Sequence, residues 1–152
     1  MQYWLLKSEP DEFSINDLAK LAPKVEPWSG IRNYQARNFI RDQMQIGDGI
    51  LFYHSSCKQP GIVGLAKVAS TPYPDPSQFD SVSPYFDAKS SIDNPRWVLV
   101  DIEFLEKFKR VISLTQIKAM PQFSELALIK SPRLSVQPVS SSHWQQLLAL
   151  GR

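Results

Sequence analysis

The amino-acid sequence predicts one mixed α/β domain, in which about five strands with short helices between and after them form a strongly curved sheet or a small barrel. Three observations predict this class. Segments rich in β-branched and aromatic residues recur along the chain, and helix-start signals fall between them. No internal repeat, low-complexity run or domain boundary divides the 152 residues, which suffice for one domain with its own core.

The first half of the chain has clear boundaries between its expected elements. Pro10 ends the first strand because proline cannot donate to a strand ladder, and Ser14 with Asp17 resembles a capping box at a helix start. Apolar residues at helical spacing predict a helix from Asn33 to Met44. The expected order is a strand at 3–7, a helix at 14–21, a loop at 23–27, a helix at 33–44, a turn at 47–49, and a hairpin of strands at 50–55 and 61–69.

The second half begins with an irregular stretch at 70–94 that contains several prolines. A loop of this length inside a compact domain is uncommon and often functional. A long alternating segment follows, and Ser113 with Gln116 marks the start of another helix. The expected order is a strand at 96–108, a helix from 113, a helical turn at 123–129, a strand at 133–139, and a terminal helix capped by Ser141 or Ser142.

The composition excludes several classes of protein. The net charge of +2 argues against a protein that coats DNA but permits a local positive patch. A single cysteine rules out an internal disulfide framework, and we expect a cytoplasmic protein that is at most nucleoid-associated. The N-terminal segment does not resemble a signal peptide, and no apolar run approaches the ~20 residues of a membrane span. Zinc-ligand spacing, a Walker loop and a GxGxxG motif are missing, so neither a metal nor a cofactor is expected.

The segment from Trp28 to Asn38, WSGIRNYQARN, carries the strongest indication of function. Its aromatic rings suit stacking on a planar ligand, its amides suit the edge of a heterocycle, and its arginines suit phosphate. We assign Trp28 to stacking, Asn33 to edge recognition, and Arg32 or Arg37 to phosphate contact. The alternative is that Trp28 is a core aromatic, but it lies in a loop outside any periodic apolar pattern. We therefore expect Trp28→Ala to leave the fold intact and to abolish base binding.

Two further segments lie where strands meet loops, a frequent place for ligand contacts. In the segment KSEP, Glu9 is suited to accept a hydrogen bond from an exocyclic amine, as carboxylates do with cytosine. The alternative, that Ser8 and Glu9 brace the following turn, stays open. In the segment NPRW, Trp97 is a candidate second stacking wall and Arg96 a candidate phosphate contact, and packing of Trp97 against a helix is an equal alternative.

Histidine and cysteine chemistry is the weaker candidate. A lone histidine in a strand is more often hydrogen-bonded and structural than catalytic, so we assign no catalytic residue. The alternative is a hydrolase or base-processing enzyme that uses His54 with Glu9 or Cys57. The acidic residues are scattered, and no two are placed as an obvious glycosidase or nuclease pair. In the last strand, Arg133 and Gln137 are candidates to border a pocket.

The chain resembles the EVE domain family almost from end to end. The motifs that carry the resemblance are YWLLKSEP at 3–10, WSGIRNYQARN at 28–38, FYHS at 52–55, PGIVG at 60–64, YPD at 73–75, NPRW at 94–97 and RLSVQP at 133–138. The resemblance implies a PUA-like pseudobarrel of about five to six mostly antiparallel strands with surrounding short helices. It also implies an aromatic-walled pocket, since members of the family are associated with modified DNA bases, including 5-methylcytosine and its oxidised forms.

Transferred motif by motif, the resemblance implies a base pocket with Arg32 and Arg37 near its mouth and Arg96 as a further phosphate contact. The expected pocket residues are Lys7, Ser8, Glu9, Trp28, Asn33, Tyr34, Tyr53, His54, Ser55 and Trp97. The predicted function is that of a non-enzymatic reader of a modified or flipped nucleobase. Modified cytosine is the expected base, and DNA is favoured over RNA as the partner. A sensor of a small molecule or free nucleotide is a further alternative. No membrane partner is expected, and a monomer is the default expectation.

Overall fold

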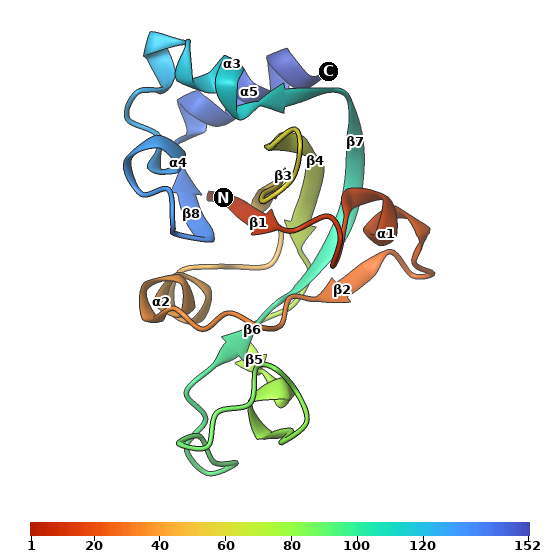
Figure 1. Cartoon of the computed structure of the whole chain (residues 1–152), viewed down its shortest axis with the longest axis vertical. Coiled ribbons are helices and arrows are strands. Elements are labelled where there is room, and N and C mark those ends of the chain that lie inside the picture. The colour runs from red at the N-terminus through yellow and green to blue at the C-terminus, as the bar shows by residue number, and fades with distance from the viewer.

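A computed structural model describes residues 1–152 and confirms the predicted fold class (Figure 1). Six strands form one curved sheet in the order β2-β7-β4-β3-β1-β8, and β1 with β3 is the parallel pair. The strands of this sheet are β1 (Tyr3–Ser8), β2 (Val25–Pro27), β3 (Gly49–His54), β4 (Gly61–Val68), β7 (Asp101–Ser113) and β8 (Val136–Val139). The other elements are α1 (Ile15–Lys20), α2 (Tyr34–Asp42), β5 (Tyr73–Pro74), η1 (Pro76–Phe79), β6 (Val98–Leu99), α3 (Leu114–Lys118), η2 (Pro121–Phe123), α4 (Ala127–Lys130) and α5 (Ser141–Gly151).

The parallel pairing of β1 with β3 decides where a site can form. The two strands end in register, so Glu9 and Ser55 leave the sheet at the same edge. β8 runs antiparallel to β1, and the Lys7 N–H donates to the Ser135 carbonyl at 3.0 Å, so the loop before β8 reaches that edge as well. Loops that diverge from the carboxyl ends of parallel strands leave a crevice, which is a frequent place for a ligand.

Core residues cover both faces of the sheet. Within β3, Ile50 and Phe52 belong to one buried cluster, and Leu51 and Tyr53 belong to the other, as the alternation of strand side chains requires. Residues of α1 and α2 complete the first cluster, and residues of α3, α4 and α5 complete the second. Figure 1 shows these last three helices together at one end of the molecule. None of the helices combines the length and the apolar character needed to cross a membrane.

Several strand boundaries differ from the sequence prediction, among them the start of β8, which lies at Val136 instead of residue 133. Residues 25–27, expected in a loop, form β2, because they pair with the first residues of β7. Pairing of so short a strand depends on its neighbour more than on its composition. β7 starts at Asp101 and continues to Ser113, beyond the predicted end at 108. Two register shifts against β4 let β7 curl around the sheet, and a bulged strand loses the simple alternation on which the prediction relied.

Local capping signals were read correctly at α1 and at α3, where Ser113 accepts the Gln116 N–H, and were misplaced at the terminal helix. Ser14 and Asp17 form the reciprocal hydrogen bonds of a capping box at the start of α1, as predicted. The terminal helix is capped by Ser140, whose hydroxyl accepts the N–H of the residue three positions later, so the assignment to Ser141 or Ser142 was wrong. Consecutive serines at 140–142 offer the same local chemistry, and only the exit from β8 selects the first.

Residues 70–97 form a lobe that projects from the sheet (Figure 1). β5 and β6 pair at its base. The buried Gln78 amide donates to the carbonyls of Asp75 and Trp97 at 2.7 and 2.8 Å, and its oxygen accepts the N–H groups of Arg96 and Trp97. The stretch predicted as irregular is thus ordered by side-chain hydrogen bonds more than by long regular elements.

Candidate functional site

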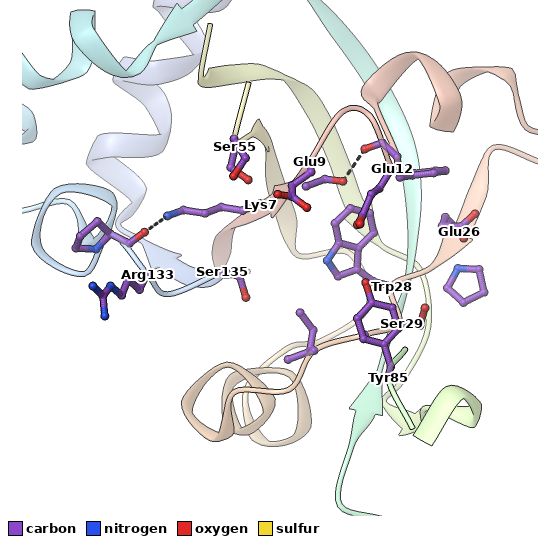
Figure 2. Close-up of a pocket in the computed structure, with 17 residues that line it drawn as sticks. Lys7, Glu9, Glu12, Glu26, Trp28, Ser29, Ser55, Tyr85, Arg133 and Ser135 are labelled. Atoms are coloured by element: carbon purple, nitrogen blue, oxygen red, sulfur yellow. Dashed lines mark hydrogen bonds between the residues drawn. The ribbon is translucent and has the colours of Figure 1, made fainter. Parts of the chain in front are cut away.

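A cavity of about 610 Å³ opens at the edge of the sheet where β1 and β3 end (Figure 2). Its volume lies within the range of small-molecule sites in proteins, roughly 300–1,000 Å³. Half of the predicted pocket residues line it, together with side chains from other parts of the chain. The predicted residues that line it are Lys7, Ser8, Glu9, Trp28 and Ser55, and the unpredicted ones include Glu12, Phe13, Glu26, Tyr85 and Ser135.

Trp28 is both a core residue and a wall of this cavity. Its side chain is only 8% exposed and packs edge-on against Phe13 and Phe52, with ring centroids at 6.1 and 5.5 Å. Its N–H donates to the Val100 carbonyl at 2.9 Å, which fixes it at the end of β2. The indole N–H makes no hydrogen bond within the protein, and no fully buried polar side-chain atom lacks a partner, so this donor faces the cavity. Figure 2 shows the indole nitrogen on the side toward Ser135.

This burial corrects the expectation that Trp28→Ala leaves the fold intact. Alanine would empty the space between Phe13 and Phe52 in the larger buried cluster. Truncations of this size in a core cost about 3–5 kcal/mol. The two interpretations of Trp28, core aromatic and ligand contact, therefore apply to different edges of the same ring.

The end of β1 supplies three polar side chains with different contacts. The Lys7 ammonium donates to the Pro132 carbonyl at 2.6 Å, and burial lowers the pKa of Lys7. The Ser8 hydroxyl donates to the Phe13 carbonyl and so braces the turn that follows β1. The Glu9 carboxylate makes no hydrogen bond within the protein and lines the cavity. Bracing is thus the role of the Ser8 side chain, whereas Glu9 keeps its full capacity to accept hydrogen bonds.

The other predicted pocket residues lie outside this cavity. Asn33 is the N-cap of α2, and its side chain accepts the Ala36 N–H at 2.9 Å. Tyr34 stacks on Trp97 with ring centroids 4.8 Å apart; packing accounts for Trp97, which is only 5% exposed, whereas Tyr34 stays half exposed. Tyr53 points to the opposite face of the sheet, into the second buried cluster. Helix capping and aromatic packing use the groups that the sequence analysis assigned to a ligand.

His54 also lies outside the cavity and has a structural contact. Its Nε2 accepts the Ile15 N–H at 3.1 Å, at the first residue of α1. Burial, and to a smaller extent the charge of Lys107, lower the pKa of His54. Its hydrogen bond does not involve Glu9 or Cys57, the two partners that the enzyme hypothesis requires. With its acceptor nitrogen occupied by a backbone N–H, the neutral imidazole is not available as a base at the cavity.

Acidification from about pH 7.5 to about pH 5.5 is expected to lower the free energy of unfolding through His54. The unfolded-state pKa is about 6.5 and the folded-state pKa is lower, so the contribution of neutral His54 is complete above about pH 6.5 and is lost as the pH falls through the folded-state pKa. The His54→Gln variant keeps an acceptor for the Ile15 N–H without titrating. Urea denaturation at both pH values should therefore show a flatter dependence for the variant, and equal dependence in both proteins would contradict this role.

Arg32 is a structural residue, and its assignment as a phosphate contact is corrected here. All five N–H groups of its guanidinium donate within the protein, to Asp75, to Ser77, to the Ile31 carbonyl and twice to the Tyr85 carbonyl. The Arg32–Asp75 ion pair measures 3.1 Å, and the Asp75 side chain is fully buried. No donor is left for a phosphate.

The other two candidate phosphate contacts also lie outside the cavity. Arg37 lies over the Tyr34 ring at 4.6 Å and donates to the Arg96 carbonyl at 3.0 Å and to the Asn38 side chain. The Arg96 guanidinium makes no ion pair or hydrogen bond within the protein. Because each retains N–H groups without a protein partner, contact of Arg37 and Arg96 with phosphate stays a prediction.

Asp75 fastens the lobe to the Trp28 segment. Its carboxylate accepts the Gly30 N–H at 2.8 Å, the Arg32 guanidinium, and the hydroxyl and N–H of Ser77 at 2.6 and 2.9 Å. Burial alone would raise the pKa of Asp75, but the hydrogen bonds from Ser77, Gly30 and Arg32 together lower it below its ordinary value. In the sequence, Asp75 ends the YPD motif, but an Asp before a Pro is ordinary turn chemistry, so its partners across the fold are not evident from the motif.

Charged side chains around the cavity come from three separate segments. They are the carboxylates of Glu9, Glu12 and Glu26 and the cations of Lys7 and Arg133. Burial, and then the nearby charge of Asp101, raise the pKa of Glu26. The acidic side chains are not arranged with others in any group of three or more that could hold a metal ion. The lining therefore offers several acceptors for the donor groups of a ligand.

Arg133 borders the cavity, as the sequence analysis suggested. It stands between this cavity and a smaller hollow of about 360 Å³, which Asn33 and Leu134 also line. Gln137 does not border it. The Gln137 amide is buried and donates to the carbonyls of Leu134 and Ser131 at 2.7 and 3.2 Å, which holds the loop before β8 in place.

Comparison with known proteins places the chain in one family. The model of the EVE domain matches residues 2–150. Thymocyte nuclear protein 1 of Rattus norvegicus is 42% identical over 165 residues, which cover 97% of this chain and 73% of the relative. The Homo sapiens protein of the same name is 39% identical over the same shares of the two chains.

Solved structures agree with the sequence comparisons. Human THYN1 protein in complex with 5-methylcytosine-containing DNA superposes with a TM-score of 0.96 at 38% identity and covers 100% of this chain and 98% of that one. A hypothetical protein from Leishmania major gives 0.94 at 44% identity over 99% and 94% of the chains. A Pseudomonas syringae protein gives 0.93 at 49% identity over 99% of each. By sequence and by fold, this chain belongs to the EVE domain family.

Proposed function

We propose that this protein is a non-enzymatic reader that binds a modified cytosine of DNA in the cavity beside Trp28. The observation that carries the proposal is an open cavity with a free indole N–H and a free carboxylate, in a fold that matches the human relative bound to 5-methylcytosine-containing DNA. The cavity is a single basin at the end of parallel strands, which suits one extruded base better than a length of duplex.

The groups in the cavity complement the edge of a cytosine. The Trp28 N–H suits an acceptor such as the ring nitrogen or the carbonyl oxygen, and the Glu9 carboxylate suits the exocyclic amine. Extrusion of the base costs a few kcal/mol, which aromatic contact worth about 1–3 kcal/mol per base offsets in large part. One buried methyl adds roughly 0.8 kcal/mol, so a methyl group alone should improve affinity only about fourfold.

Contacts within the protein support a reader over an enzyme. The Ser8 hydroxyl is committed to the Phe13 carbonyl, and the His54 acceptor nitrogen to the Ile15 N–H. The cavity thus has no hydroxyl nucleophile paired with an imidazole base, which is the arrangement that acyl or glycosyl transfer by these groups would need.

Titration calorimetry with duplexes that carry one cytosine or one 5-methylcytosine at the same position tests the proposal. We expect tighter binding of the methylated duplex by about fourfold and weakening of both by about tenfold or more in Glu9→Gln, since a charged acceptor is replaced by a neutral one. Glu125→Gln removes an exposed carboxylate that pairs with Lys130 and serves as the matched control. A parent protein that binds neither duplex contradicts the proposal, and a new product in the mass spectrum after incubation supports the enzyme instead.

Arg133→Gln should weaken the salt dependence of DNA binding. Arg133 lies at the rim of the cavity and forms no ion pair, so a phosphate beside the extruded base is its natural partner. Loss of one phosphate contact should make the slope of log K against log salt less steep by roughly 0.9. Arg110→Gln, which removes an exposed arginine on β7 away from the cavity, is the control. An unchanged slope in Arg133→Gln would place the phosphates elsewhere.

A further inference from the structure

The lobe at 70–97 delivers one side chain to the cavity, that of Tyr85. No sequence motif marks this residue, and it lies in the part of the lobe farthest in sequence from β5 and β6. Yet its ring stands over Gly30, only two positions from Trp28. The lobe therefore contributes directly to the basin in which the base is proposed to bind.

Gly30 leaves the space that the Tyr85 ring occupies. A Cβ at position 30 would lie 2.9, 3.0 and 3.1 Å from three ring atoms of Tyr85, closer than ordinary contact allows. Gly30 also has a φ of +89°, a conformation that residues with a side chain rarely adopt. Both the backbone shape and the missing side chain at position 30 are thus needed for the ring to lie where it does.

The buried ion pair holds the two sides of this contact together. Arg32 donates to the Tyr85 carbonyl from Nε at 3.0 Å and from Nη2 at 2.8 Å. Asp75 accepts from the Gly30 N–H at 2.8 Å and from Arg32 at 3.1 Å. These four hydrogen bonds fix the backbone of Tyr85 relative to the backbone of Gly30, on which the ring packs.

The Tyr85 ring itself remains available to a ligand. It is 37% exposed although it packs on Gly30, and its hydroxyl makes no hydrogen bond within the protein. Figure 2 shows the hydroxyl end of Tyr85 directed toward the side of the cavity that Trp28 lines. The indole is largely enclosed by Phe13 and Phe52, so it offers its edge to the cavity, whereas Tyr85 has the accessible ring surface.

We propose that Tyr85 is the aromatic wall against which the bound base packs, and that Gly30 and Arg32 are its positioning residues. The inference rests on the proposed function and deepens it, because it transfers the stacking role from Trp28 to a residue of the lobe. The ligand class is a planar heterocycle presented by DNA. Trp28 then reads the edge of the base through its N–H.

Binding of a duplex that carries one 5-methylcytosine, measured by calorimetry, tests this assignment. Tyr85→Ala should weaken binding by about tenfold to a hundredfold, and Tyr85→Phe should stay within about threefold of the parent, since the ring surface is kept. Gly30→Ala should resemble Tyr85→Ala because its Cβ displaces the ring. Gly47→Ala is the matched control, since Gly47 has a φ of +94° but nothing within 4 Å of its Cβ position. It shares the backbone strain without the clash and should bind as the parent does.

The double variant Gly30→Ala/Tyr85→Ala separates positioning from general damage. If Gly30 acts through Tyr85, the second substitution adds little to the first, and the two losses are far from additive. Thermal unfolding shows that each variant is folded before binding is measured. Parent-like binding by Tyr85→Ala, or additive losses in the double variant, overturns this inference alone. A parent protein that fails to bind the methylated duplex overturns both this inference and the proposed function.

Discussion

Replacement of Asp75 by alanine is expected to destabilise the fold by about 3–5 kcal/mol, because it leaves the partly buried Arg32 guanidinium without its counter-charge. The same change removes the acceptor of the Gly30 N–H and of two Ser77 groups. Urea denaturation at neutral pH measures the loss. Asp42→Ala breaks an ion pair with Arg41 whose side chains are about half exposed and screened by solvent, so it should cost far less. A cost for Asp75→Ala no larger than that of this control would show that the network does not stabilise the lobe.

The loss in Asp75→Ala should depend on pH in a defined direction. The folded-state pKa of Asp75 is lowered, so the ionised carboxylate contributes its full stability above the unfolded-state pKa of about 3.9. That contribution is lost as the pH falls through the folded-state pKa. The difference in unfolding free energy between parent and variant should therefore be constant near neutral pH and shrink in strong acid. The pH range in which the Asp75 contribution is lost lies well below the range in which the His54 contribution is lost. One series of denaturation experiments over pH therefore separates the two effects.

Trp28→Ala is expected to cost about 3–5 kcal/mol of stability and to remove detectable binding of the methylated duplex by the molecules that remain folded. The first effect follows from the burial of the ring between Phe13 and Phe52, and the second from the loss of the indole N–H that faces the cavity. Urea denaturation and calorimetry at a temperature where the variant is folded measure the two effects separately.

Trp144→Ala is the matched control for this experiment. Trp144 is 7% exposed, close to the 8% of Trp28, but it belongs to the other buried cluster and stacks on Tyr3. Its truncation should destabilise the fold to a similar extent and leave the affinity of the folded protein unchanged. If both variants lose affinity equally, the effect of Trp28 on binding is indirect. Trp28→Phe, which keeps most of the packing and loses the N–H donor, should lose more affinity than stability.

In the Trp28 segment, residue composition and tertiary structure assign different roles to the same side chains. Residues 28–31 of this segment line the cavity, and a loop that follows a strand is a frequent place for ligand contacts. The roles expected for two of its side chains differ from the contacts that these side chains make in the structure. Asn33 and Arg32 carry the groups that recognise bases and phosphates, but the same groups cap helices and neutralise buried carboxylates. Residue type alone does not distinguish these uses.

The residues that the prediction missed were brought in by distant contacts. Gly30 and Asp75 are 45 positions apart, and Arg32 and the Tyr85 carbonyl are 53 apart. A tyrosine inside a proline-containing stretch has no periodic pattern and no neighbouring motif that distinguishes it. Only the closure of the lobe against the Trp28 segment shows that its ring reaches the cavity.

Local signals in the chain were sufficient for the fold class, for most strands of the main sheet and for the caps of α1 and α3. Such features depend on residues within a few positions of one another, so they can be predicted from a single segment of the sequence. Tertiary packing decided which side chains make structural contacts and which stay available to a ligand. Arg32, Trp97 and His54 took structural roles because each found a partner far along the chain, while Glu9 and the Trp28 indole N–H kept their hydrogen-bonding capacity because no other part of the fold reached them.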